Sequence, residues 1–101
     1  MNNDLNMNEF REKKKKINDI KYITYNKIYT NLIETIKLTA SNGINFCLFE
    51  IPLLIFGEPL YQINDIKNYL ILKINEEIYK KNITEVIFYE PNILYINWTL
   101  D

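Results

Sequence analysis

Residues 85–98 read EVIFYEPNILYINW, and this stretch decides the fold of the chain. At its centre, residues 90–92 (Glu-Pro-Asn) have turn chemistry, because Pro presets the first central dihedral angle and Asn tolerates the second. The flanking runs 85–89 and 93–98 are apolar and aromatic, so they are predicted to pair as an antiparallel hairpin. Residues 93–98 are apolar on both faces, which favours a central position in a sheet.

A further strand is predicted over residues 44–51, in which Glu50 is the only charged residue. Its apolar residues point in both directions, and we expect a strand of this kind to be covered on both faces, at least in part. Apolar residues at helical spacing predict a helix over residues 64–81, between this strand and the hairpin. With residues 93–98 at the centre, the strand order of the sheet becomes 1-3-2, and residues 44–51 form an open edge.

A long helix is predicted over residues 9–40, which contain no Gly or Pro. Its apolar and aromatic residues share one helical face: Tyr22, Tyr25, Tyr29, Leu32, Ile33, Ile36 and Ala40. Residues 1–8 are polar and aperiodic and are predicted to be disordered. The fold class is therefore α+β, with a long N-terminal helix, then β-α-β-β, in a single domain over residues 9–101. The three-stranded sheet is expected to be mixed, with the helices packed on it. A helix of this length spans roughly 45 Å, so its start should project beyond the sheet.

The residue types that carry catalysis are scarce in this chain. It has no His, one Cys and two isolated Gly residues, so nucleophile–base pairs, metal-ligand clusters and phosphate-binding loops cannot be assembled from the usual parts. We therefore expect a non-enzymatic protein without a cofactor or metal. A single Cys47 fits a reducing compartment, and no run approaches the roughly 20 apolar residues that span a bilayer. These features predict no membrane association and an intracellular location.

Basic residues gather near the start of the first helix, where Arg11 is followed by Lys13, Lys14, Lys15 and Lys16. Two interpretations are open. A block of like charge is usually a solvated face. In the alternative interpretation, the same side chains contact the phosphates of a nucleic acid. The net charge of −1 argues against a surface that binds nucleic acid over the whole molecule. The predicted strands carry no basic residue, which argues against base stacking on the sheet.

Four short segments carry a resemblance to a known family. They are CLFEIP at residues 47–52, FGEPLY at 56–61, NYL at 68–70 and PNILYINW at 91–98. Together they resemble a family of short, uncharacterised proteins of nucleocytoplasmic large DNA viruses (giant viruses), through a G-x-P-L-Y turn and a P-N-x-L-Y-I-x-W motif. The resemblance covers residues 46–98 and extends to the first helix only in its Lys-rich, helical character. It implies no assigned activity, and by analogy alone it suits a virion component or an assembly adaptor. If the protein is viral, its intracellular location would be the host cytoplasm or the virion.

The sequence favours a protein–protein interaction or structural module, as a viral virion or assembly component. The alternative is a nucleic-acid-associated protein that uses its basic N-terminal helix. We expect residues 44–51 to pair with a protein partner or a second copy, because an unpaired apolar edge strand is a template for another chain. Phe49, Tyr95 and Trp98 are the candidate interface residues, with structural roles as the alternative for Tyr95 and Trp98.

Overall fold

The hairpin predicted from residues 85–98 is present. The computed structural model describes the backbone of residues 3–76 and 82–100, and the side chains of residues 20–76 and 82–100. Strands β2 (Ile83–Tyr89) and β3 (Ile93–Trp98) pair in antiparallel fashion, with Ile87 opposite Tyr95. The peptide bond between Glu90 and Pro91 in the connecting turn is cis. The apolar runs on either side of residues 90–92 therefore pair as predicted.

The strand order β1-β3-β2 is also confirmed, with β1 (Phe46–Glu50) at one edge. The sheet is antiparallel throughout rather than mixed, because β3 runs against both of its neighbours. Strands β1 and β2 point in the same direction, but β3 separates them and they do not pair. Strand β1 is shorter than the predicted 44–51, since its ladder with β3 extends only from Phe46 to Glu50.

Two helices complete the fold, in the order α1 (Asn3–Ser41), β1, α2 (Ile63–Glu76), β2 and β3. Helix α1 begins at Asn3 rather than Glu9, so residues 3–8, for which the composition predicts disorder, are helical in the structure. Those residues include no Gly or Pro that would stop a helix. The other end is as predicted: Gly43 adopts φ of +80° and its N–H donates to the carbonyl of Ala40. The predicted end of the second helix, over residues 77–81, lies outside the described residues.

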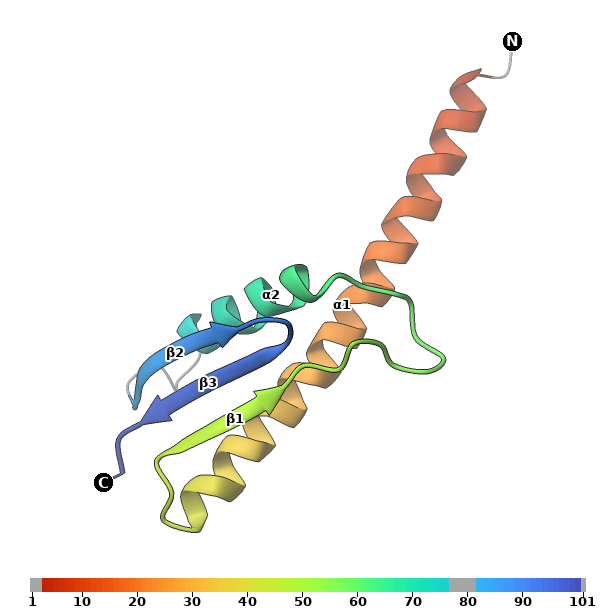
Figure 1. The fold of residues 1–101 in the computed structure, drawn as a ribbon. Helices are drawn as coiled ribbons and strands as arrows, with labels where there is room; N and C mark the ends of the chain where they lie inside the picture. Colours follow the sequence, from red (N-terminus) through yellow and green to blue (C-terminus); the bar gives the residue numbers. More distant parts are fainter. Residues whose placement is uncertain (1–2, 77–81, 101) are drawn as a thin grey trace.

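The first half of α1 projects from the rest of the molecule (Figure 1). At about 1.5 Å per residue, its 39 residues span roughly 58 Å, which accounts for most of the 65 Å length of the protein. The radius of gyration is 17.2 Å, against about 13 Å for a compact chain of this size. The predicted projection of the helix start is therefore confirmed, and the packed domain is formed by the second half of α1 with α2 and the sheet.

Both helices cover the same face of the sheet (Figure 1). The core between them is apolar: Tyr25, Ile28, Leu32, Ile33 and Ile36 of α1, Ile66, Leu70 and Ile74 of α2, and Cys47, Ile51, Leu94, Ile96 and Trp98 from the strands and their ends. The expectation that β1 would be covered on both faces is wrong. Cys47 is buried, whereas Phe46 and Leu48 are 46% and 62% exposed. The reason is that neither helix reaches the opposite face.

Candidate protein-interaction surface

The face of the sheet turned away from the helices is mostly apolar. Side chains alternate between the two faces along each strand, and the register of the ladders fixes which residues share this one. We call it the outer sheet face. It consists of Phe46, Leu48 and Glu50 of β1, Ile93, Tyr95 and Asn97 of β3, and Glu85, Ile87 and Tyr89 of β2. An antiparallel sheet with one solvated face usually carries polar residues there, so six apolar or aromatic residues among nine are unusual.

Large side chains on the outer sheet face are open to solvent. Leu48 is 62% exposed, Tyr89 51% and Phe46 46%. The rings of Phe46 and Tyr95 lie 6.1 Å apart across the two strands, and Asn97 Nδ2 donates a 2.9 Å hydrogen bond to the Tyr95 hydroxyl oxygen. These contacts hold the aromatic rings in place on the sheet. A contiguous exposed apolar patch of this kind is typical of an interaction site.

The edge of β1 adds backbone groups to this surface. Trp98 N–H donates to the carbonyl of Asn45, and Ile51 N–H donates to the carbonyl of Asn92. Hydrogen-bonded pairs alternate along an antiparallel ladder, so the odd-numbered residues of this segment pair with β3. The backbone N–H and C=O groups of Phe46, Leu48 and Glu50 consequently point towards the open edge. A polypeptide added there would pair with the same three residues whose side chains lie on the outer sheet face.

Only one of the three candidate interface residues lies on this face. Tyr95 is half-buried on the outer sheet face, whereas Phe49 packs against the core on the helix side. Trp98 is 4% exposed and also lies on the helix side. The structure does not bring Phe49 and Trp98 to this surface, since the alternation of β1 and β3 directs both inward, and the burial of Trp98 favours the structural role that was its alternative. The large apolar side chains that β1 exposes on the outer sheet face are those of Phe46 and Leu48.

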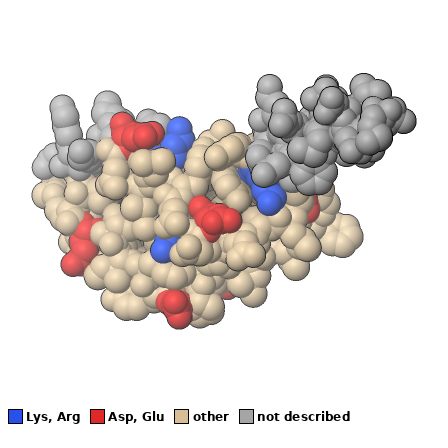
Figure 2. Space-filling view, turned by 90° about the horizontal axis from the view of Figure 1, so that it is seen from above, with Lys and Arg blue, Asp and Glu red and all other residues tan. Residues whose placement is uncertain are grey.

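The basic residues Arg11 and Lys13–Lys16 occupy the projecting half of α1 (Figure 1). Their side chains lie outside the described residues, so their use as a nucleic-acid contact stays a prediction. On the face seen in Figure 2, Lys and Arg side chains are few and are separated by uncharged and acidic surface. Among residues 20–76 and 82–100, this view shows no basic patch that would track a phosphate backbone.

The loop between β1 and α2 exposes a second set of apolar side chains. Leu53, Leu54, Phe56 and Leu60 are between 58% and 99% exposed, with Phe56 the most exposed of them. Gly57 adopts φ of +84° in a turn that is closed by a 3.0 Å hydrogen bond from the N–H of Glu58 to the carbonyl of Ile55. The sequence does not predict this exposure, because a short apolar run without helical or strand periodicity looks the same whether it is buried or not.

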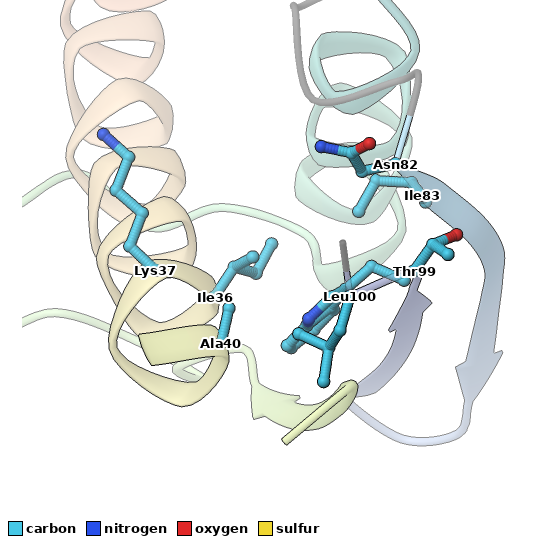
Figure 3. Close-up of a pocket in the computed structure, with 8 residues that line it drawn as sticks. Ile36, Lys37, Ala40, Asn82, Ile83, Thr99 and Leu100 are labelled. Atoms are coloured by element: carbon cyan, nitrogen blue, oxygen red, sulfur yellow. The ribbon is translucent and has the colours of Figure 1, made fainter. Parts of the chain in front are cut away.

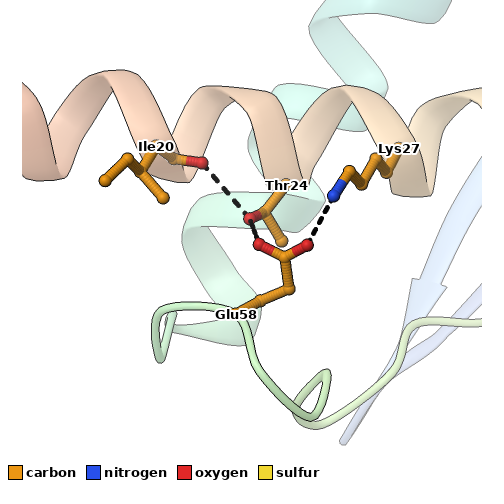
Figure 4. A network of polar contacts seen from close by, with 4 residues as sticks. All are labelled: Ile20, Thr24, Lys27 and Glu58. Atoms are coloured by element: carbon orange, nitrogen blue, oxygen red, sulfur yellow. Dashed lines mark hydrogen bonds and ion pairs between the residues drawn. The ribbon is translucent and has the colours of Figure 1, made fainter.

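Glu58 fastens this loop to α1 (Figure 4). Its carboxylate accepts a hydrogen bond from Lys27 Nζ at 2.5 Å, and the other oxygen lies 3.0 Å from Thr24 Oγ1. The single hydroxyl proton of Thr24 is shared between this oxygen and the carbonyl of Ile20, 3.2 Å away. Hydrogen bonds from Lys27 and Thr24 lower the pKa of Glu58 below its ordinary value. Glu58 therefore links this loop to α1 through two side chains.

Neither a metal site nor a membrane span is found in the described part of the chain. Among the side chains of residues 20–76 and 82–100, no three of His, Cys, Asp or Glu lie together as a metal would require. Burial raises the pKa of the Cys47 thiol, which disfavours the reactive thiolate. Within the described residues, no helix combines the length and the apolar content needed to cross a membrane.

The comparisons with known proteins place the chain in a family. Residues 5–75 match the model of a family of unknown function, DUF5759. The chain belongs to this family. It is also 38% identical over 96 residues to an uncharacterised protein of Acanthamoeba polyphaga mimivirus, a match that covers 93% of this chain and 76% of that relative. DUF5759 is thus a family of uncharacterised giant-virus proteins, as the resemblance implied, and its match includes α1. No solved structure matches the chain.

Proposed function

We propose that this DUF5759 protein is a non-enzymatic protein-interaction module that adds a strand of its partner to the edge of β1. The observation that carries the proposal is the edge of β1, with which no other strand of the described chain pairs and at which Leu48 is 62% exposed. Strand addition uses main-chain hydrogen bonds for affinity and alternate side chains for specificity. Strand β1 offers both, because its edge-directed residues also line the outer sheet face.

A second copy of the chain is the first partner to test. Two β1 strands paired antiparallel about a two-fold axis would join their sheets into one of six strands, with Leu48 facing its own copy at the centre. The edge carries few of the features that prevent such pairing, since Glu50 is its only charge and Pro52 follows the strand. Glu50 of each strand would then lie opposite Phe46 of the other strand, so the two carboxylates would not face each other.

Light scattering at increasing concentration tests this model with two pairs of matched variants. Leu48→Lys should abolish association, whereas Leu72→Lys on α2 should not, because Leu72 is similarly exposed (55%) but lies away from the sheet. Glu50→Pro removes an edge-directed N–H and should also abolish association. Glu50→Gln removes the same charge, keeps the N–H and should leave association intact. Equal behaviour of the two members of either pair contradicts strand addition to a second copy.

The proposal for the biological setting is an analogy based on the family and has no support from the chemistry of the surface. A small giant-virus protein with an open sheet edge suits a virion component or an assembly adaptor, and we propose that role for this chain. Quantitative mass spectrometry of purified mimivirus particles, compared with infected cells, tests it for the 38% identical relative. Enrichment in particles supports a virion role, and absence from particles argues for a role inside the infected cell.

A further inference from the structure

Helix α1 borders a pocket beside its last turns and a cleft nearer its middle. The pocket, of about 260 Å³, mixes aliphatic side chains with Lys37, Asn82 and Thr99, so its lining selects no class of ligand (Figure 3). The cleft, of about 510 Å³, is lined by residues of α1 and α2 alone, and its volume lies within the roughly 300–1,000 Å³ that is typical of small-molecule sites. Because both helices lie behind the sheet, the cleft is separate from the edge of β1.

Three tyrosine rings line this cleft, which we call the tyrosine cleft. Tyr22 and Tyr25 are contributed by α1, and Tyr69 lies across from them on α2. The three ring centroids are 5.4 to 6.0 Å apart, and the ring planes are inclined to each other by 48° to 80°, so no two of these rings are stacked face to face. Tyr25 is 7% exposed, whereas Tyr22 is 56% exposed and open to an incoming molecule. The face of an aromatic ring is electron-rich, so such a cluster attracts a cation.

Charged side chains of α2 add to this attraction. Asp65 and Glu76 are four residues before and seven residues after Tyr69, on the same side of the helix, and both are exposed. Burial raises the pKa of Tyr25, and the negative charge of Asp65 raises it further, so this carboxylate acts on the ring cluster. With two carboxylates and the single ammonium of Lys73, the lining has a net charge of −1.

Lys73 indicates that a cation fits against these rings. Its Nζ lies over the ring of Tyr69, 6.0 Å from the centroid, which is the distance limit for a significant attraction between a cation and a ring face. The chain therefore places its own ammonium group over one ring of the tyrosine cleft. A second cation that approaches Tyr69 more closely would displace Lys73, which is half-buried and belongs to the last turn of α2.

We propose that the tyrosine cleft binds a trimethylammonium group, which displaces Lys73 from the ring of Tyr69. Enclosure by aromatic rings is the usual way in which proteins recognise quaternary ammonium groups. The methyl groups would pack against Tyr22 and Tyr69, and the exposed carboxylate of Asp65 would balance the charge. A trimethylammonium group has no N–H donor, so it needs no hydrogen-bond acceptor from the rings. The other lining residues, Asn68 and Leu72, are uncharged and do not oppose a cation.

Titration with choline, followed by NMR of the whole chain, tests the proposal. The matched control ligand is 3,3-dimethylbutan-1-ol, which has the shape of choline without its charge. Choline should shift the ring resonances of Tyr22 and Tyr69 with a saturable dependence on concentration, and it should bind at least threefold more tightly than the alcohol. Equal affinities, or no saturable shift with choline, would overturn the proposal.

The same group also occurs in trimethylated lysine, so a peptide that contains this residue is titrated in parallel. Tighter binding of choline assigns the site to a small molecule, and tighter binding of the peptide assigns it to a modified protein; either result supports recognition of the trimethylammonium group. The unmethylated peptide should bind more weakly than the trimethylated one. Equal binding of the two peptides contradicts that recognition.

Variants of Tyr22 and Lys73 separate attraction by the rings from simple burial in a cleft. Tyr22→Leu keeps an apolar side chain but removes the ring and should weaken choline binding about two- to fivefold, whereas Tyr22→Phe should bind like the original chain. Lys73→Gln removes the competing ammonium and should tighten choline binding at least twofold without changing the affinity for the alcohol. A dispersed spectrum shows that each variant is folded. Equal choline binding by the two Tyr22 variants, or unchanged or weaker binding by Lys73→Gln, would overturn the proposal.

Discussion

Replacing Trp98 by Ala tests whether this residue is part of the core or of an interface. The side chain is 4% exposed, and truncating a buried Trp costs about 3–5 kcal/mol. One feature places the expected loss at the lower end: truncation also removes the indole donor, which has no acceptor among the described residues and so carries a penalty of about 1–3 kcal/mol. We expect the free energy of unfolding to fall by about 3 kcal/mol.

Urea unfolding followed by far-ultraviolet circular dichroism measures this loss, because the variant lacks the only Trp fluorophore. A loss of about 3 kcal/mol corresponds to a Tm lowered by roughly 12–24 °C in a domain of this size. The control is Leu72→Ala, since Leu72 is 55% exposed and its truncation should change the stability by less than about 0.5 kcal/mol. If Trp98→Ala costs less than about 1 kcal/mol, the ring is not packed in the core and the assignment of Trp98 to the helix side is refuted.

Two further substitutions test the contacts that position the loop and the β2–β3 turn. Glu58→Gln should lower the stability at neutral pH. Because the pKa of Glu58 is lowered in the folded chain, its contribution is present above the ordinary carboxyl pKa and disappears as the pH falls through the lowered value. Unfolding curves of the two proteins should therefore converge in acid, and a constant difference at all pH values would exclude the Lys27 contact as its source. Asn92→Ala removes the 2.8 Å hydrogen bond from Asn92 Nδ2 to the carbonyl of Ile51 and should cost about 1–3 kcal/mol in the same assay. A loss within error of zero would mean that water replaces the amide.

Local chemistry was enough to predict most of the fold. The turn residues at 90–92 and the apolar runs beside them predict the hairpin, and the two-faced apolar pattern of residues 93–98 predicts the central strand. Strand order then follows from connectivity. The direction of pairing needed one more step: a strand that lies between two others and runs against both makes the whole sheet antiparallel.

The candidate surface was harder to predict, for a physical reason. Strand β1 is apolar at both odd and even positions, so its pattern does not reveal which side the helices cover. Phe49 and Leu48 are adjacent and equally apolar, yet Leu48 is the one that is exposed. The contacts of Glu58 with Thr24 and Lys27 join residues more than 30 positions apart. No local periodicity encodes such pairs, so the anchored loop becomes visible only in the structure.

The exposed residues of the outer sheet face also set the strength of the association that should be sought. Full burial of a large apolar side chain contributes about 1.5–3 kcal/mol, and roughly half of Phe46 and of Leu48, the two large apolar side chains beside the edge of β1, is already buried. Covering the rest in both copies of a pair offers at most about 3–6 kcal/mol, against the 4–15 kcal/mol that association costs in lost freedom. Packing on this face alone therefore does not hold a complex together. A few backbone hydrogen bonds along β1, at a net of about 0.5–1.5 kcal/mol each, must supply the remainder. Strand pairing and the side-chain contacts along β1 are thus both required, and we expect an association so weak that it is measurable only at high protein concentration or when another partner brings contacts of its own.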